Sequence, residues 1–140
     1  MAHIFSTGIE LRFSDLDGYG HVNSAVYFTY LETARVKLFR KQFEELTRQG
    51  VFLVVARAEC DFKLPIMFTD SVEVAVRISR VGGASFDLEY RLHDNNGKTF
   101  ANARTTMVCF DNGAGVTVPV PESIRAFHSA EALAPIQGDN

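Results

Sequence analysis

The sequence predicts an α+β domain of two layers, in which a five-stranded antiparallel sheet packs against one long helix. Four segments between residues 52 and 111 alternate polar and apolar side chains, the pattern of strands in a sheet with one face in water. Residues 23–49 repeat apolar side chains at three- and four-residue spacing, and the first half is apolar on most sides. Such a helix has to be covered, so we expect the dry face of the sheet to wrap around it.

Bulk composition bounds the class of protein. The 140 residues predict a single domain over residues 1–140, with an ordered core over about 4–128 and a mobile C-terminal tail. The net charge is −3 and no basic block is present, which argues against a nucleic-acid partner. No apolar run could span a membrane and the N-terminus has no leader pattern, so we expect a cytoplasmic protein. Cys60 and Cys109 are expected to be reduced core thiols.

The first elements follow from periodicity and breakers. Residues 4–14 alternate apolar and polar side chains and predict a half-buried strand. Residues 15–20 hold acids and glycines and predict a loop. The helix is expected to begin at Asn23 or Ser24, because either side chain can cap the first N–H groups, and to end near Gln49 before a glycine.

The rest of the chain predicts four more strands joined as a meander. These strands are expected over residues 52–64, 71–81, 85–93 and 98–111. Residues 94–97, Asp-Asn-Asn-Gly, are typical of a tight hairpin turn. The last strand is apolar on both faces, which indicates a central position in the sheet or a subunit contact. Residues 113–121 are expected to form a loop and residues 122–127 one helical turn.

The loop before the helix carries the residues best suited to chemistry. Asp15 and Asp17 are one residue apart, so in an extended chain they point to opposite sides and need not share a role. The structural interpretation is that such loop acids cap the following turn. The functional interpretation is that Asp17 acts as a base or nucleophile opposite the helix start, where N–H groups without partners can stabilise an oxyanion. This arrangement can hydrolyse an activated carbonyl, by direct attack or through water.

Other polar residues nearby leave alternatives open. His21 either bonds backbone groups of the turn or orients water or substrate. A Ser24–His21–Asp17 relay is weakened because Ser24 already has a capping role. A metal site from the two acids and the histidine is weakly supported, and we expect none. Glu32 and Arg35 are three residues apart on the helix and are expected to pair with each other.

Residues 13–27, Phe-Ser-Asp-Leu-Asp-Gly-Tyr-Gly-His-Val-Asn-Ser-Ala-Val-Tyr, resemble the opening motif of hotdog-fold acyl-CoA thioesterases of the 4-hydroxybenzoyl-CoA thioesterase type. Four shorter pieces agree, each nonspecific alone: Tyr30-Leu31-Glu32-Thr33-Ala34-Arg35, Asp61-Phe62-x-x-Pro65 with Asp70 shortly after, Gly83-Ala84-Ser85-Phe86 and Val108-Cys109-Phe110-Asp111. The resemblance covers about residues 8–128. It implies the hotdog fold, in which the antiparallel sheet curls around one central helix.

The resemblance also implies an activity and a set of site residues. The reaction is hydrolysis of an acyl-CoA thioester, or of an acyl-carrier-protein thioester. The matching catalytic positions are Asp17 as nucleophile or general base, the backbone N–H of Ser24 as the group that polarises the carbonyl, and His21. The expected substrate-binding residues are Gly20, Asn23, Ala25, Tyr27 and Ser85.

The resemblance further implies an assembly. Sites of this family form between subunits, so a dimer or tetramer is expected, and coenzyme A is a substrate carrier rather than a bound cofactor. Only Arg80 lies near residues 81–84, the turn where related enzymes hold the phosphates of coenzyme A, so no phosphate clamp is assigned. Two alternatives stay open: a non-catalytic acyl-binding hotdog module, and a hydratase on the same fold. The hydratases usually carry a histidine in a proline-rich loop, which this chain lacks.

Overall fold

A computed structural model describes residues 4–128, so the expected C-terminal tail lies outside the described part of the chain. Five strands form an antiparallel sheet in the order β1-β3-β4-β5-β2. Their bounds are β1 Phe5–Ile9, β2 Val51–Phe62, β3 Val72–Val81, β4 Ser85–His93 and β5 Thr99–Asp111. The two-residue strand β6, Val116–Thr117, pairs with the end of β5, inside the segment expected to be a loop.

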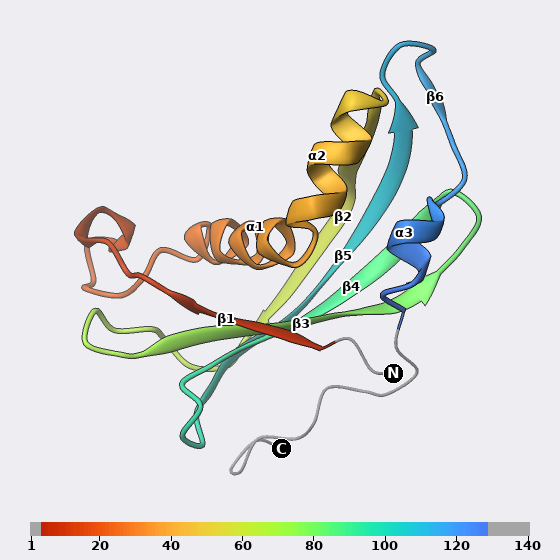
Figure 1. Cartoon of the computed structure of the whole chain (residues 1–140). Helices are drawn as coiled ribbons and strands as arrows, with labels where there is room; N and C mark the ends of the chain where they lie inside the picture. The colour runs from red at the N-terminus through yellow and green to blue at the C-terminus, as the bar shows by residue number, and fades with distance from the viewer. Residues whose placement is uncertain (1–3, 129–140) are drawn as a thin grey trace.

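The main helix lies across the concave face of the curled sheet (Figure 1). This helix is α1, Val26–Leu38, and α2, Arg40–Arg48, follows it at an angle. Two short helical turns, η1 (Phe13–Asp15) and α3 (Glu122–Arg125), complete the fold. The arrangement confirms the predicted α+β hotdog architecture.

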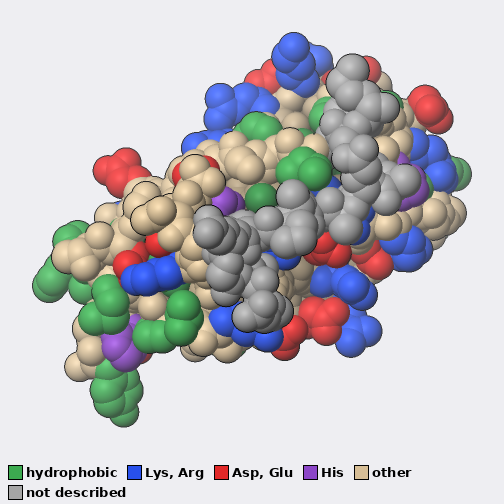
Figure 2. All heavy atoms as spheres, turned by 90° about the horizontal axis from the view of Figure 1, so that it is seen from below, with side chains coloured by type: hydrophobic (Ala, Val, Ile, Leu, Met, Phe, Trp, Pro, Cys, Tyr) green, Lys and Arg blue, Asp and Glu red, His purple; other side chains and the backbone are tan. Residues whose placement is uncertain are grey.

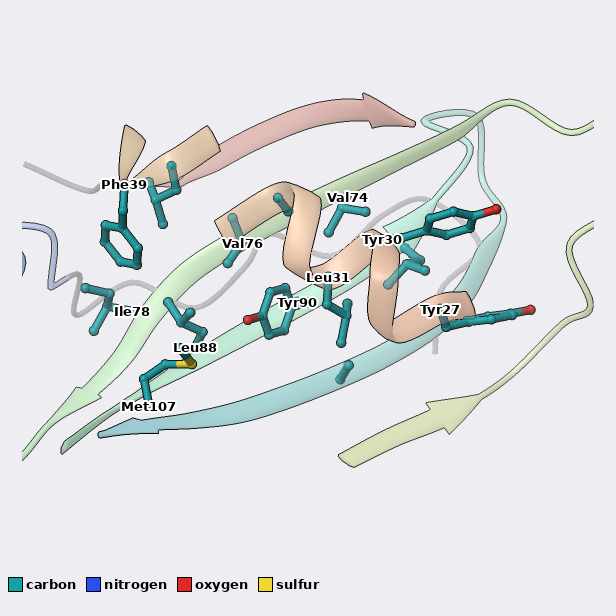
Figure 3. Packing of buried hydrophobic residues seen from close by; sticks show 14 of the residues in the cluster. Tyr27, Tyr30, Leu31, Phe39, Val74, Val76, Ile78, Leu88, Tyr90 and Met107 are labelled. Carbon is teal, nitrogen blue, oxygen red and sulfur yellow. The ribbon is translucent and has the colours of Figure 1, made fainter. Parts of the chain in front are cut away.

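The core sits between α1 and the sheet (Figure 3). The buried side chains of α1 recur at three- and four-residue spacing: Tyr27, Tyr30, Leu31, Ala34 and Leu38. Alternate residues of the strands meet them, among them Val74, Val76, Ile78, Leu88, Tyr90 and Met107. The two periods that predicted the elements therefore also select the residues that are buried. Cys60 is half-buried, Cys109 is buried, and both are free thiols, as predicted.

The prediction of one helix over residues 23–49 is wrong in two respects. Regular helix begins at Val26, after a turn over residues 24–25, and the run is broken at Phe39, where φ is −104° and ψ is 20°. The Phe39 ring is 1% exposed and makes edge-to-face contacts with the rings of Phe43 and Phe86. We attribute the break to this burial, because the Phe39 ring packs against Phe86 of β4 at this point.

The predicted strand over residues 4–14 is also too long. β1 ends at Ile9, and Phe13 belongs to η1, with 80% of its surface exposed. The predicted four-strand meander holds only for β3, β4 and β5. β2 pairs with β5 at the far side of the sheet, so it is an edge strand and not a neighbour of β3. β5 then lies between β4 and β2, which confirms the central position inferred from its two apolar faces.

The hairpin turn after β4 is confirmed. Asp94 Oδ1 accepts hydrogen bonds from the N–H groups of Asn96 (2.8 Å) and Lys98 (2.9 Å). Asn95 and Gly97 have positive φ angles of 57° and 96°, which asparagine and glycine tolerate best.

Candidate active site

The loop between η1 and α1 folds back on itself as a small hairpin. The N–H of Asp17 donates to the carbonyl of His21 (2.8 Å), and the N–H of Gly20 donates to the carbonyl of Asp17 (3.2 Å). Leu16 and Val22 form an antiparallel bridge below this turn. Gly20 has a φ of +81°, so the turn needs a residue without a side chain at this point. The sequence Asp-Gly-Tyr-Gly-His therefore presents Asp17 on a closed turn.

The two carboxylate oxygens of Asp17 differ in their surroundings. Oδ1 accepts hydrogen bonds from the N–H groups of Tyr19 (2.8 Å) and His21 (3.3 Å). Within residues 4–128 no donor bonds Oδ2. The side chain is half-buried. One oxygen therefore stabilises the turn, as the structural interpretation predicted, while the other is available to a ligand.

The start of α1 leaves one backbone donor without an acceptor. Asn23 Oδ1 accepts the N–H of Ala25 (2.9 Å), so Asn23 caps the turn that leads into the helix. The N–H groups of Val26 and Tyr27 donate to the carbonyls of Asn23 (2.9 Å) and Ser24 (3.3 Å). The N–H of Ser24 has no acceptor among the described residues. It lies at the positive end of the helix dipole, which favours a developing negative charge.

A single cavity of about 320 Å³ connects these groups. Its lining residues are Asp17, His21, Val22, Ser24, Tyr27, Phe62, Lys63, Leu64 and Pro65. The second wall, residues 62–65, is held to the loop because the N–H of Val22 donates to the carbonyl of Ile66 (2.9 Å) and His21 bridges to Met67. The cavity thus brings together the three residues singled out as catalytic, and Tyr27.

Tyr27 packs at the base of this cavity. It is 3% exposed, and its ring contacts that of Phe62 edge to face, with centroids 4.9 Å apart. Burial raises the pKa of the Tyr27 phenol, so the hydroxyl stays protonated near neutral pH. The ring of His21 is half-buried in the lining, and no described residue hydrogen-bonds it. The Ser24–His21–Asp17 relay therefore has none of its hydrogen bonds.

Ser85 is not brought to the cavity. β1 ends beside Val72, the first residue of β3, so the turn after Val81 lies at the opposite end of the sheet from the loop (Figure 1). Ser85 Oγ accepts a hydrogen bond from Arg80 (3.0 Å), and Arg80 in turn binds Asp87 at 2.8 Å. The cation considered for coenzyme A phosphates is therefore already paired.

Lys63 and Leu64 belong to the cavity, although no sequence motif singles them out. The neighbouring Phe62 and Pro65 belong to a motif that carries the resemblance, whereas Lys63 is one polar residue of the alternating pattern over residues 52–64. The pairing of Val22 with Ile66, which places this segment beside the loop, joins residues 44 positions apart and has no local signal. Among the residues that line the cavity, Lys63 is the one lysine or arginine.

The other conspicuous charges have structural partners. Asp15 is 1% exposed, and Tyr30 donates a hydrogen bond of 2.7 Å to it. Glu32 and Arg35 lie 3.9 Å apart, as predicted. Over residues 4–128 no three histidine, cysteine or acidic side chains are grouped so that they could hold a metal ion. None of the helices described is both long and apolar enough to cross a membrane.

Hydrophobic side chains gather at the end of the molecule that carries this loop, at the lower left of Figure 2. The exposed fractions are 80% for Phe13, 86% for Tyr19, 46% for Phe68 and 42% for Met67. The Phe13 and Phe68 rings touch edge to face, with centroids 6.2 Å apart. An apolar rim of this kind is unusual on an isolated surface and indicates a contact with a ligand or another chain.

Comparison with known proteins agrees with this geometry. A family model described as the Thioesterase-like superfamily matches residues 11–127. The long-chain acyl-CoA thioesterase FadM of Escherichia coli is 29% identical over 108 residues, 75% of this chain and 82% of FadM. The acyl-CoA thioesterase YbgC of Haemophilus influenzae is 29% identical over 129 residues, 89% of this chain and 94% of YbgC. A thioesterase from Thermus thermophilus, solved with coenzyme A and zinc, is 35% identical with a TM-score of 0.76, covering 87% of this chain and 94% of that one.

Proposed function

Because the chain belongs to the Thioesterase-like superfamily and is a thioester hydrolase, we propose that it cleaves acyl-CoA thioesters at the cavity between Asp17 and the start of α1. The relatives named as acyl-CoA thioesterases support this choice of substrate. The observation that carries the proposal is the pair of groups in one cavity: Asp17 Oδ2 and the N–H of Ser24, both without a partner among residues 4–128.

The proposed chemistry follows from this pair. The thioester carbonyl oxygen accepts the N–H of Ser24, which stabilises the negative charge that develops as the carbonyl carbon is attacked. Asp17 Oδ2 either takes a proton from water as it adds to that carbon, or adds itself and forms an anhydride that water then opens. The carbon–sulfur bond breaks, and the thiolate leaves and takes up the proton. Both routes consume one water and release one acid and one thiol.

The two hydrogen bonds to Oδ1 of Asp17 have a role in this reaction. Because the N–H groups of Tyr19 and His21 hold Oδ1, the carboxylate keeps one orientation, and Oδ2 is left for a ligand. A preorganised group of this kind loses little entropy in the reaction. His21 and Tyr27 are proposed to line the acyl or pantetheine path, with Gly20, Asn23 and Ala25 shaping the backbone around it.

We also propose that the protein assembles as at least a dimer through β2. Within residues 4–128 β2 pairs with β5 alone, so the outer edge of this twelve-residue strand has no partner in the described part of the chain. The exposed apolar side chains on it include Phe52, Val54, Val55 and Phe62. Residues 51–56 of this edge hold neither a charge nor a proline that would block pairing, so this half is a template for another strand. A second copy would cover this edge, and Ser85 could contact substrate only if another copy supplied it.

The test is release of thiol from a panel of acyl-CoA thioesters, followed with a thiol reagent. Steady release of one thiol per acid formed is the result expected. Binding of acyl-CoA without thiol release would instead favour the non-catalytic module, and consumption of an enoyl-CoA without thiol release would favour a hydratase. Matched acyl-carrier-protein thioesters in the same panel decide between the two carriers.

We also propose that the protein acts in the cytoplasm.

A further inference from the structure

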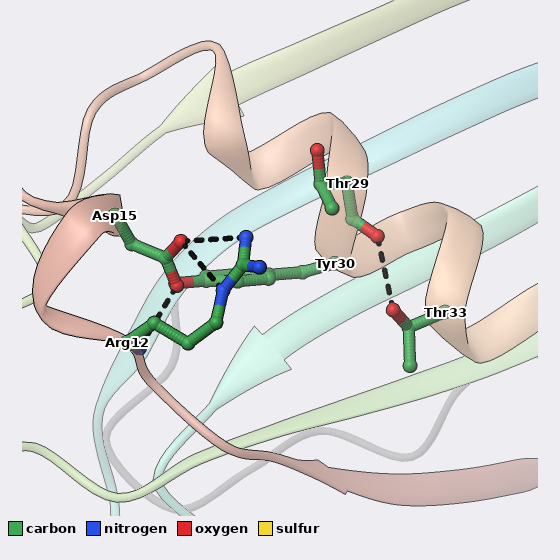
Figure 4. A network of polar contacts seen from close by, with 5 residues as sticks. All are labelled: Arg12, Asp15, Thr29, Tyr30 and Thr33. Atoms are coloured by element: carbon green, nitrogen blue, oxygen red, sulfur yellow. Dashed lines mark hydrogen bonds and ion pairs between the residues drawn. The ribbon is translucent and has the colours of Figure 1, made fainter.

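Asp15 is a buried carboxylate two residues before Asp17, and it does not line the cavity. We propose that Asp15 is a positioning residue for the hydrolysis, which acts with Tyr30 to hold the loop of Asp17 in register with the start of α1. The proposal rests on the proposed function, because it assigns no bond-making step to Asp15. Figure 4 shows the carboxylate between Arg12, on the chain before the loop, and Tyr30, on α1.

Both carboxylate oxygens of Asp15 accept hydrogen bonds from Arg12 or Tyr30. Oδ2 accepts the hydroxyl of Tyr30 at 2.7 Å and the backbone N–H of Arg12 at 3.0 Å. Oδ1 accepts Nε and Nη2 of Arg12 at 3.2 and 3.1 Å. A charge that is 1% exposed is tolerated only when it is bonded in this way, so its position is tightly specified.

The backbone of Asp15 also connects this anchor to the two segments that carry Asp17 and Ser24. Its carbonyl accepts the N–H of Asn23 at 2.8 Å, which closes the base of the hairpin that carries Asp17. Asn23 in turn caps the turn that contains Ser24. Asp17 therefore lies within this hairpin and Ser24 directly follows it. The base of the hairpin is fixed to Tyr30 through the side chain of Asp15. If this anchor shifts, the carboxylate and the backbone donor shift relative to each other, and a displacement of about 1 Å can lower a rate by about 100-fold.

The chain offers a matched buried tyrosine outside the site. The hydroxyl of Tyr90 lies 2.7 Å from Thr105 Oγ1, the same distance as that between Tyr30 and Asp15, and both residues of this second pair are buried. Tyr90 belongs to β4, and it does not line the cavity of Asp17. Tyr90→Phe therefore removes a comparable buried hydroxyl without touching the loop.

The experiment compares Tyr30→Phe and Tyr90→Phe by kcat, KM and thermal unfolding. We expect Tyr30→Phe to lower kcat about tenfold and to change KM less than about twofold. The free energy lost with one hydrogen bond to a charged group corresponds to a change in rate of about this size. Tyr90→Phe is expected to lower Tm to a similar extent and to leave kcat unchanged. A merely structural role for Tyr30 would give the two variants the same kcat once the folded fractions are equal, and this result would overturn the proposal.

Two further variants separate the anchor from the catalytic assignment. Asp15→Asn combined with Tyr30→Phe should lower kcat no more than the more severe single variant, because both remove one linkage; additive losses would contradict a shared anchor. Asp17→Asn tests the proposed function itself. If Asp17→Asn turns over normally, the catalytic assignment and the positioning role both fail. If Asp17→Asn is inactive and Tyr30→Phe is fully active, only the positioning role fails.

Discussion

Asp17 and Ser24 line one cavity, and each contributes a polar group that no described residue bonds: Oδ2 of the carboxylate and the N–H of the backbone. The other oxygen of Asp17 is bonded by two N–H groups of its own turn. The structural and the functional interpretations of this acid are therefore compatible, because they use different atoms. The N–H groups of Tyr19 and His21, which hold the turn closed, also fix the orientation of the carboxylate.

Lys63 is predicted to assist binding of the coenzyme A part of the substrate. It lines the cavity of Asp17, and no described carboxylate lies within ion-pairing distance of it. Lys63→Gln should raise KM for acyl-CoA about three- to tenfold, with kcat little changed, because a partly solvated charge pair contributes about 1 kcal/mol. The effect should fade at high salt.

Two comparisons control for this prediction. Lys41→Gln removes an exposed lysine of α2 that is not in the cavity, and it should leave KM unchanged. An N-acetylcysteamine thioester has no phosphates, so Lys63→Gln should not alter its KM. An equal rise in KM for both thioesters would show that Lys63 does not recognise the phosphates.

Val54 lies on the open edge of β2 with 42% of its surface exposed. Val54→Lys is expected to weaken assembly, because a lysine on an edge strand opposes pairing with a second strand. Light scattering at matched concentrations should show a lower mass for Val54→Lys than for the unmodified chain. Val116→Lys, at a valine of β6 that is 54% exposed, is the control and should keep the original mass. A monomeric unmodified chain would contradict the proposed assembly.

Asp15 should make stability depend on pH. Burial opposes its ionisation, but the hydrogen bonds from Tyr30 and Arg12 outweigh burial and leave the pKa of Asp15 below its ordinary value. The stabilisation is therefore present above the unfolded-state pKa of about 3.9 and is lost as the pH falls through the lower folded-state value. At pH 7, Asp15→Asn should unfold more easily by roughly 1–3 kcal/mol. Thermal unfolding from pH 7 to pH 3 should show this difference shrinking, and a constant difference would contradict it.

The sequence predicts the fold well where the side-chain pattern is local. The strand bounds of β4 are the predicted ones, and the turn at Asp94 is formed by the residues that predicted it. The failures involve tertiary contacts. The break at Phe39 follows from rings contributed by β4 and α2, and helical spacing alone contains no information about them. The position of β2 beside β5 is likewise a choice of partner, which alternation does not encode.

The residues of the site also fall into two groups, those that are close in sequence and those that only tertiary contacts bring together. Asp17, His21 and Ser24 lie within eight residues of each other, so motif and local geometry suffice to group them. Lys63 enters only because the chain returns to the loop at Ile66, 44 positions after Val22, and bonds to it there. Ser85 was grouped with them by resemblance, whereas the single chain places it at the other end of the sheet. A contact with a second chain, such as the one proposed through β2, would leave no trace in the contacts within one chain.

Asp17 is proposed to supply the reacting carboxylate, and Asp94 provides a matched control. Oδ1 of Asp94 accepts two backbone N–H groups two and four residues later, the same pattern as Oδ1 of Asp17, but Asp94 is not in the cavity. The most direct measurement is thiol release from an acyl-CoA by Asp17→Asn and Asp94→Asn. In both variants the asparagine oxygen keeps the turn capped, so Tm should change little. We predict a loss of at least about 100-fold in kcat for Asp17→Asn alone. Turnover of Asp17→Asn equal to that of Asp94→Asn would show that Asp17 does not supply the reacting carboxylate.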